Sequence, residues 1–155
     1  AKKARKPSQP GSPAGSGITL DPPSGFQRVT PYLYYEDAGK MLKWLGKAFG
    51  VEARSTQKGK GGMVHHAEVP VGDDGLVLIG SSGSKAFKNP SRLGAVTCSL
   101  YIYVDDVDAH CARARAAGAE VIEEPTLQPY GDKRYAVSDP EGHPGTLPPS
   151  RRDAR

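Results

Sequence analysis

The apolar positions in the first half of the chain follow a strand pattern and then a helix pattern. Residues 28–35 alternate as a strand does, and Asp37 supplies an N-cap for a following helix. Gly50 is placed to end that helix. Further strands are predicted at 51–55, 63–69 and 76–79, with glycine-rich turns between them. One helix face collects the larger apolar residues, Met41, Leu42, Leu45, Ala48 and Phe49. The unit is strand, helix and three strands, or βαβββ.

The same pattern begins again after residues 81–95, a polar stretch long enough to be a linker or a functional loop. A strand at 96–104 precedes an Ala-rich helix that Asp105 or Asp106 caps and Gly118 closes. Strands are then predicted at 119–124, at 133–138 and near Thr146. Residues 32–37 match residues 101–106 in type and order, and Gly50 aligns with Gly118. The sequence therefore predicts an α+β fold built from a tandem βαβββ repeat.

The positive charge of the chain lies at its two ends. The formal net charge is +4, but residues 18–150 hold 14 basic and 16 acidic side chains, a net charge of −2. Residues 1–25 form a basic, Pro/Gly-rich segment that we expect to be a disordered tail, and 149–155 a short C-terminal tail. Nucleic-acid binding needs its basic residues on folded elements, so we expect no nucleic-acid partner.

Two further features bear on where the protein works. No apolar run is long enough to cross a membrane, so we expect no membrane partner. Cys98 and Cys111 are too few for a disulfide framework and indicate a reducing, cytoplasmic compartment. Strand parity points Cys98 toward the helix layer, and Cys111 lies on the second predicted helix. We therefore expect both to be small core residues rather than nucleophiles.

Seven short motifs occur in an order that resembles a known family. They are Thr30-Pro31-Tyr32-Leu33, Ala48-Phe49-Gly50, His66-Ala67-Glu68, Val104-Asp105-Asp106-Val107-Asp108, Ala117-Gly118-Ala119-Glu120, Tyr130-Gly131-Asp132 and Asp139-Pro140-Glu141-Gly142-His143. Together they resemble the small glyoxalase-like branch of the glyoxalase/bleomycin-resistance/dioxygenase superfamily, the vicinal oxygen chelate proteins. The resemblance implies a domain at 26–148 whose modules, about 28–80 and 96–148, form a curved mixed sheet around a cleft. It also implies a homodimer, with residues 81–95 free to reach the partner.

The resemblance implies a divalent metal as well, but the matching positions do not supply its ligands. In the metal-dependent members His, Gln or Glu side chains occupy four strand positions, which fall here on Thr30, about Leu78, Ser99 and Thr146. Hydroxyl and apolar groups cannot replace imidazole or carboxylate around a transition metal. His65 and His66 are adjacent on a strand and point to opposite faces. We expect no metal site and no cofactor.

Strand parity predicts which side chains face the cleft. Tyr32 and Tyr34 share one face of the first strand, while Leu33 and Tyr35 face the helix. The repeat places Ser99, Tyr101 and Tyr103 in the same way, and His66 shares a strand face with Glu68. An alternative is that the tyrosines fill a barrel interior and that the histidines are ordinary surface residues. The candidate ligand-binding residues are Tyr32, Tyr34, His66, Glu68, Ser99, Tyr101, Tyr103 and Tyr130.

Two functions of different class are compatible with these observations. The first is a metal-free binding protein whose Tyr-lined cleft holds a small aromatic or drug-like molecule, neutral or weakly cationic. The second is a metal-dependent lyase, isomerase or dioxygenase of the same superfamily, with ligands that the sequence does not identify. The four positions without a strong ligand favour the first.

Overall fold

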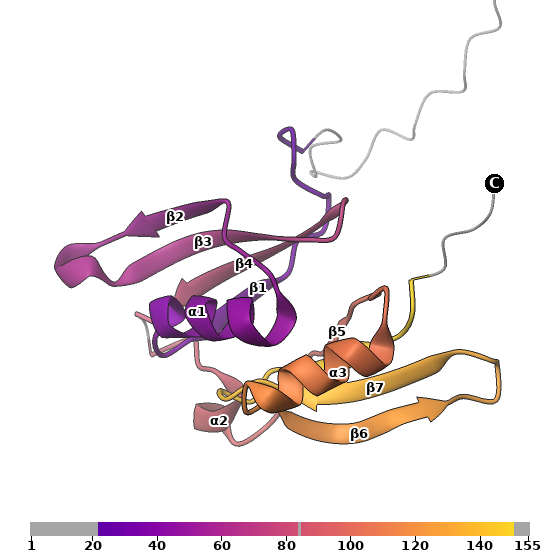
Figure 1. Cartoon of the computed structure of the whole chain (residues 1–155). Helices are drawn as coiled ribbons and strands as arrows, with labels where there is room; N and C mark the ends of the chain where they lie inside the picture. The colour runs from indigo at the N-terminus through magenta and orange to yellow at the C-terminus, as the bar shows by residue number, and fades with distance from the viewer. Residues whose placement is uncertain (1–21, 84, 151–155) are drawn as a thin grey trace, which may run out of the picture.

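The computed structural model describes residues 22–83 and 85–150, and it contains two βαβββ modules in succession (Figure 1). The first consists of β1 (Tyr32–Tyr35), α1 (Ala38–Phe49), β2 (Ser55–Lys58), β3 (Val64–Val71) and β4 (Gly75–Ser81). A 3₁₀ turn, η1 (Lys60–Gly62), joins β2 to β3. A short helix, α2 (Pro90–Leu93), lies in the linker. The second module consists of β5 (Leu100–Tyr101), α3 (Val107–Ala116), β6 (Glu120–Leu127), β7 (Lys133–Ser138) and β8 (Pro144–Leu147).

The strands form two separate four-stranded mixed sheets with the same internal order. The orders are β1-β4-β3-β2 and β5-β8-β7-β6. In each sheet the first strand pairs in parallel with the last strand of its module, and the other pairings are antiparallel. The predicted α+β class and the tandem βαβββ repeat are confirmed.

Local capping explains why the two helices begin at corresponding places. The Asp37 side chain accepts a hydrogen bond of 3.0 Å from the Lys40 amide, and Asp106 accepts one of 2.9 Å from the Ala109 amide. Each bond satisfies an amide that has no partner inside its own helix. Gly50 ends α1 in the left-handed conformation at φ 71°, which glycine adopts without strain.

The apolar core lies between each sheet and its helix and continues across the junction of the modules. The first cluster includes Met41, Leu45 and Ile79, and the second includes Val107, Cys111 and Tyr135. Phe49 packs against both clusters. Polar contacts strengthen the same junction. Trp44 Nε1 donates to the Ala117 carbonyl at 2.7 Å, and Arg113 donates to the carbonyls of Ala48 and Phe49 at 3.1 and 3.0 Å.

Several sequence-based boundaries differ from the structure. The strand predicted at 96–104 is reduced to Leu100–Tyr101, with an isolated bridge from Val104 to Pro149. Cys98 precedes this strand and is exposed, so its predicted core position is wrong, whereas Cys111 is buried as expected. The linker contains α2, which the sequence analysis did not predict. Most of the expected N-terminal tail, residues 1–21, and residues 151–155 of the C-terminal tail lie outside the described residues. In the described part of the chain, no helix is long and apolar enough to span a membrane.

Candidate functional site

The face of the first sheet that points away from α1 carries a row of side chains across all four strands. Tyr32 pairs in register with Leu78, Leu78 with Glu68, and Glu68 with Ser55. Residues directly opposite each other on neighbouring strands project to the same face. Tyr35 and Leu33 belong to the first core cluster on the helix side. Tyr32 and Tyr34 therefore project to the open face, as strand parity predicts.

A chain of polar contacts crosses this open face. The Tyr32 hydroxyl is hydrogen-bonded to His66 Nδ1 at 3.0 Å, and His66 Nε2 lies 3.9 Å from Glu68 Oε1. Arg54 Nε donates to Glu68 Oε2 at 2.7 Å, and its guanidinium lies 5.1 Å from the centre of the Phe26 ring. The predicted pair of His66 and Glu68 is thus in contact with Tyr32. Because Arg54 neutralises Glu68, the carboxylate adds little net charge to the face.

Three aromatic rings stack at the β1 edge of the same face. The Tyr32 and Tyr34 rings are 4.9 Å apart with planes 17° from parallel, and Tyr34 and Phe87 are 4.3 Å apart at 16°. Phe87 comes from the linker and remains 48% exposed. Burial and the neighbouring Tyr34 raise the pKa of Tyr32, so its phenol stays protonated at neutral pH. The stack offers a flat apolar edge with phenol hydroxyls at its rim.

Gly80 makes room for the Tyr32 phenol. A Cβ added at this position would lie 2.9 Å from the Tyr32 hydroxyl oxygen and 2.7 Å from the His65 carbonyl oxygen. Both separations are shorter than a normal van der Waals contact. The absence of a side chain at residue 80 therefore lets Tyr32 lie over β4 and reach His66.

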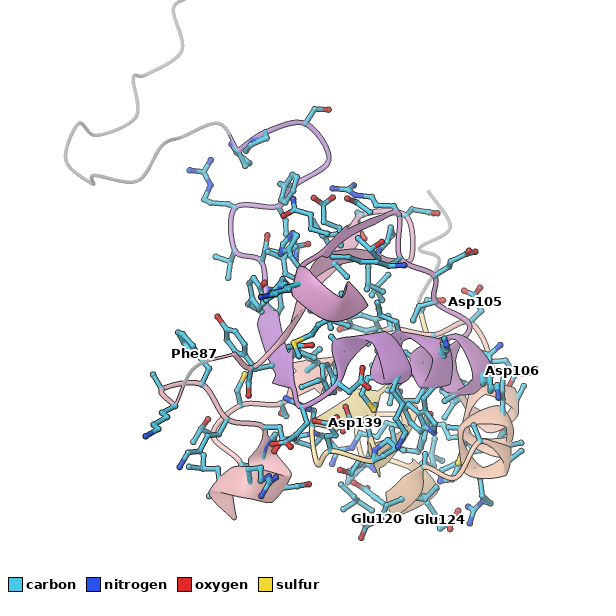
Figure 2. The ribbon with its side chains drawn as sticks, turned by 90° about the vertical axis from the view of Figure 1, so that its left-hand side faces the viewer. Phe87, Asp105, Asp106, Glu120, Glu124 and Asp139 are labelled. Atoms are coloured by element: carbon cyan, nitrogen blue, oxygen red, sulfur yellow. The ribbon has the colours of Figure 1, made fainter. Side chains whose placement is uncertain are left out.

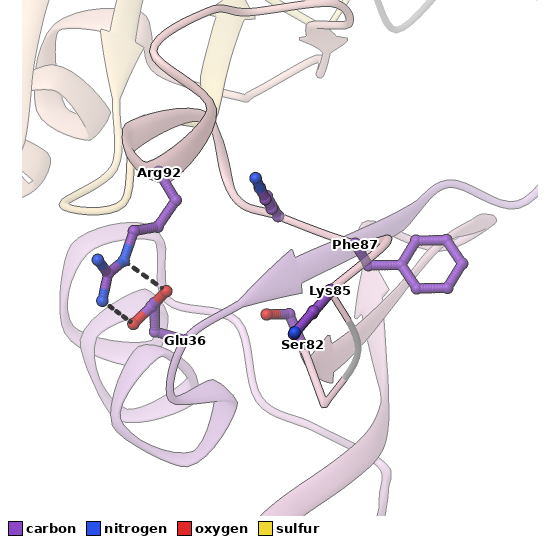
Figure 3. Close-up of a pocket in the computed structure, with 6 residues that line it drawn as sticks. Glu36, Ser82, Lys85, Phe87 and Arg92 are labelled. Carbon is purple, nitrogen blue, oxygen red and sulfur yellow. Dashed lines mark hydrogen bonds and ion pairs between the residues drawn. The ribbon is translucent and has the colours of Figure 1, made fainter.

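Two hollows open to solvent lie along the linker segment that carries Phe87, and Figure 3 shows the one lined by Glu36 and Arg92. One, of about 350 Å³, is lined by Glu36, Ser82, Lys85, Phe87, Lys88 and Arg92. The other, of about 330 Å³, is lined by Tyr34, Lys85, Ala86, Phe87, Lys88 and Leu93. Both volumes are at the small end of the range for small-molecule sites. Phe87 lies at one side of the molecule, away from Asp105 and Asp106 (Figure 2).

The open face of the second sheet carries a second group of tyrosines. The Tyr101 and Tyr103 rings are 5.7 Å apart, edge to face, and the Tyr130 phenol lies close enough to that of Tyr101 to interact with it electrostatically. Ile102 and Val104 pack against the second core. Tyr101 and Tyr103, which alternate with them, therefore project to the opposite, open face of the sheet. All three phenols are more than half exposed. Partial burial raises the pKa of Tyr130.

The eight predicted residues therefore divide into two groups. Tyr32, Tyr34, His66 and Glu68 are in contact on the first sheet, and Tyr101, Tyr103 and Tyr130 are in contact on the second. Ser99 is exposed just before β5 and makes neither set of contacts. Within residues 22–83 and 85–150, no ring contact joins the two groups.

Sequence reasoning missed the residues that surround the first group. Phe87, Lys85 and Lys88 lie in the linker, and Arg54 lies just before β2. A lone aromatic flanked by two lysines in a stretch of small residues is a signal that could have marked the linker as functional. Its pairing with Tyr34 could not be read from periodicity, because the two residues are far apart in the chain.

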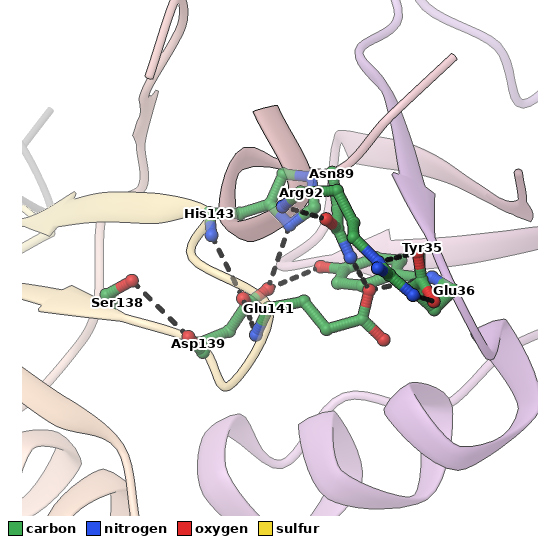
Figure 4. A network of polar contacts seen from close by, with 8 residues as sticks. All are labelled: Tyr35, Glu36, Asn89, Arg92, Ser138, Asp139, Glu141 and His143. Carbon is green, nitrogen blue, oxygen red and sulfur yellow. Dashed lines mark hydrogen bonds and ion pairs between the residues drawn. The ribbon is translucent and has the colours of Figure 1, made fainter. Parts of the chain in front are cut away.

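A polar network holds the linker against both modules (Figure 4). Arg92 donates to both carboxylate oxygens of Glu36, at 2.9 and 3.1 Å, which lowers the pKa of Glu36. Asn89 is 2% exposed and donates to Glu141 Oε2. Glu141 Oε2 also accepts from the Glu36 amide at 2.7 Å. The linker is thereby tied to the end of β1 and to the β7–β8 turn.

The paired βαβββ modules, with the same strand order in both sheets, define a glyoxalase-like fold. The chain belongs to the Glyoxalase/Bleomycin resistance protein/Dioxygenase superfamily, whose family model matches residues 25–144. It is 30% identical over 123 residues to the uncharacterized protein Rv0887c of Mycobacterium tuberculosis, covering 77% of this chain and 72% of that protein.

Solved structures show the same fold. TioX from Micromonospora sp. ML1 is 30% identical with a TM-score of 0.64, over 77% of this chain and 95% of TioX. A superfamily member from Sphaerobacter thermophilus is 20% identical with a TM-score of 0.63, over 78% and 94% of the two chains. A glyoxalase I mutant from Zea mays is 15% identical with a TM-score of 0.63, over 78% of this chain and 44% of the maize chain.

The residues at the superfamily's metal positions do not fit a metal. The Thr30 hydroxyl donates to the Gln27 carbonyl at 3.0 Å, and Leu78 has no donor atom in its side chain. Ser99 is exposed, and Thr146 lies between Tyr101 and Ala136 in the second sheet. Across the described ranges, no three His, Cys, Asp or Glu side chains are grouped closely enough to hold an ion. Neutral hydroxyls and an isobutyl group are poor ligands for the metals that this fold holds elsewhere.

Proposed function

We propose that this protein binds a planar aromatic small molecule, without a metal, on the aromatic face formed by Tyr32, Tyr34 and Phe87. The main observation that supports this proposal is the continuous stack of these three rings beside two hollows. A flat ligand can extend such a stack and bring its polar substituents to the phenol hydroxyls. His66, with its contact to Tyr32, supplies one further hydrogen-bonding group.

The second group of tyrosines supports a role for a second copy of the chain. Tyr101, Tyr103 and Tyr130 form an exposed aromatic patch that no ring of the first group contacts in the described residues. Exposed patches of this kind mark interaction sites. We propose a homodimer in the cytoplasm, in which the face of one copy's second sheet completes the site on the other's first sheet. Light scattering should show twice the chain mass, and a monomer at every concentration would contradict this.

The binding proposal is tested by titration with naphthylmethanol, a neutral planar probe, followed by its fluorescence. Replacing Tyr34 and Tyr103 together by Ala should weaken binding by about 1–3 kcal/mol, because each stacking contact contributes roughly 0.5–1.5 kcal/mol. Each single variant then shows which tyrosine group contacts the probe. Tyr35→Phe, whose ring lies in the core on the helix side, is the matched control and should leave affinity unchanged. Unchanged binding in the double variant, or no binding at all, contradicts the proposal.

Elemental analysis separates this function from metal-dependent catalysis. We expect no stoichiometric transition metal in the purified protein, because the side chains at the four family positions are poor ligands. One ion per chain, lost on replacing His66 or His143, would support an enzyme of the superfamily instead.

A further inference from the structure

We propose that the aromatic ligand carries an acidic group, such as a carboxylate on its ring system, and that Lys85 and Lys88 bind this group. In this arrangement the ring stacks at Phe87 and Tyr34. The inference rests on the proposed function and specifies the chemical class of its ligand.

The two hollows share the residues that carry this proposal. Lys85, Phe87 and Lys88 line both of them, and Tyr34 also lines the second, so each hollow combines at least one aromatic residue with the same two lysines. The Lys85 side chain and the Phe87 ring extend in opposite directions from the linker (Figure 3). A molecule lying along Phe87 can therefore place its ring on one side of the segment and a charged substituent near the lysines.

Charge pairing around the hollows leaves the lysines available. Glu36 is neutralised by the two hydrogen bonds from Arg92, and Glu68 by the bond from Arg54. Lys85 and Lys88 make no ion pair with any carboxylate in residues 22–83 and 85–150. The linker between β4 and β5 contains no acidic residue of its own. The balance of charge beside the aromatic stack is therefore positive, which favours an anion and opposes a cation.

The lysines stand on an anchored segment rather than on a free loop. Asn89, next to Lys88, is 2% exposed and is held by Glu141, and Arg92 is held by Glu36. The stack of Phe87 on Tyr34 fixes one of the two residues between the lysines. Anchored backbone reduces the entropy that a charged side chain loses when it binds a ligand.

This ligand class differs from the neutral or weakly cationic one that the sequence analysis predicts. The prediction of a neutral or weakly cationic ligand rests on the strand residues alone, whose polar groups are mostly neutral hydroxyls. The structure adds the linker to the site, and with it two lysines that form no ion pair within the described part of the chain.

The test compares two probes with one ring system, naphthoate and neutral naphthylmethanol, on the full chain. Lys85→Gln/Lys88→Gln should raise the Kd for naphthoate about tenfold and leave the Kd for naphthylmethanol unchanged. The control Lys58→Gln/Lys60→Gln removes the same charge at the far edge of the sheet, on β2 and η1, and should change neither value. Added salt should weaken wild-type binding of naphthoate but not of naphthylmethanol.

Each outcome decides one of the two proposals. If both probes bind equally and the linker variant changes neither, the acidic-ligand proposal is wrong while the binding function stands. If naphthoate loses as much affinity in the Lys58/Lys60 control, the effect is one of net charge, and the proposal is also wrong. If neither probe binds the wild-type protein, both proposals fail.

Discussion

The hydroxyl of Tyr35 donates a 2.7 Å hydrogen bond to Asp139 Oδ2, and this bond joins the end of β1 to the turn after β7 (Figure 4). Both groups are buried, at 1% and 7% exposure. Asp139 Oδ1 accepts from the amides of Glu141 and His143 at 2.9 and 3.0 Å. Burial, and then the carboxylate of Asp139, raise the pKa of Tyr35, which remains a hydrogen-bond donor at any ordinary pH. The Asp139–His143 motif thus serves the junction of the two modules.

Removing this hydroxyl should destabilise the protein without weakening ligand binding. Tyr35→Phe removes the hydroxyl donor of a buried carboxylate oxygen and leaves it His143 Nδ1, at 3.3 Å, as a polar neighbour, which costs roughly 1–3 kcal/mol of unfolding free energy. Urea unfolding measures the loss, and Tyr103→Phe, at an exposed phenol, is the matched control with no expected change. Equal stability of Tyr35→Phe and wild type would show that the bond does not hold the modules together.

A methyl group at residue 80 should displace the Tyr32 phenol. In Gly80→Ala the new Cβ would meet the Tyr32 hydroxyl and the His65 carbonyl, so the bond between Tyr32 and His66 should break. Overpacking of this kind costs about 1–3 kcal/mol of stability. NMR of the His66 ring nitrogens reports the lost bond directly.

Gly83→Ala supplies the control for that substitution, because a Cβ at residue 83 meets no atom within 4 Å among the described residues. It should leave both stability and the His66 resonances as in wild type. If Gly80→Ala also leaves those resonances in place, the close approach of Tyr32 to β4 does not position the phenol.

Much of the fold could be predicted from sequence because the signals that set it are local. Asp37 and Gly50 mark the ends of α1 within one turn of chain, and the structure uses both as caps. Parity along β1 assigns Tyr32 and Tyr34 to one face and Tyr35 to the other by geometry alone. The turn at 72–75 and the strand at 133–138 likewise depend on neighbouring residues.

The remaining features depend on contacts between distant residues. β5 pairs with β8 only through Leu100 and Tyr101, so only two of the residues predicted as a strand at 96–104 form one. Cys98 is exposed for that reason. The stack of Phe87 on Tyr34 depends on the path of the linker, which Asn89 and Arg92 fix through partners in both modules. The signals for α2, an Asn-Pro start and a following Gly94, were nonetheless present in the sequence.

Acidification should weaken the junction between α1 and α3 through His110. Its ring stacks on Phe49, and its Nδ1 lies 2.6 Å from the Tyr135 hydroxyl. Burial, with Arg113 nearby, lowers the pKa of His110 to about 4. The unfolded chain, with a pKa near 6.5, therefore binds more protons than the native protein between these two values. The contribution of the neutral His110 ring to the free energy of unfolding is fully present above pH 6.5 and declines as the pH falls toward 4.

Urea unfolding of wild type and His110→Gln across this range checks the effect. Carboxylates make the stability of both proteins depend on pH. The effect of His110 is therefore the difference in unfolding free energy between the two proteins at each pH. The difference in unfolding free energy should shrink as the pH falls below 6.5, because only the wild type has a buried imidazole whose protonation destabilises the native state. A constant difference would show that His110 is not held neutral by its surroundings.

The buried amide of Asn89 should control the order of the linker. Its Oδ1 accepts from the Arg92 amide at 2.8 Å as the cap of α2, and its Nδ2 donates to Glu141. Asn89→Ala removes both contacts, and loss of the cap alone costs about 1 kcal/mol. We expect brief trypsin treatment to cleave after Lys85, Lys88 and Arg92 faster than in wild type, while cleavage after Lys58 and Lys60 is unchanged. Ser91→Ala, an exposed position on the same helix, is the control. Equal acceleration at every site would instead indicate global unfolding, and no acceleration would show that Arg92 and Glu36 hold the linker without Asn89.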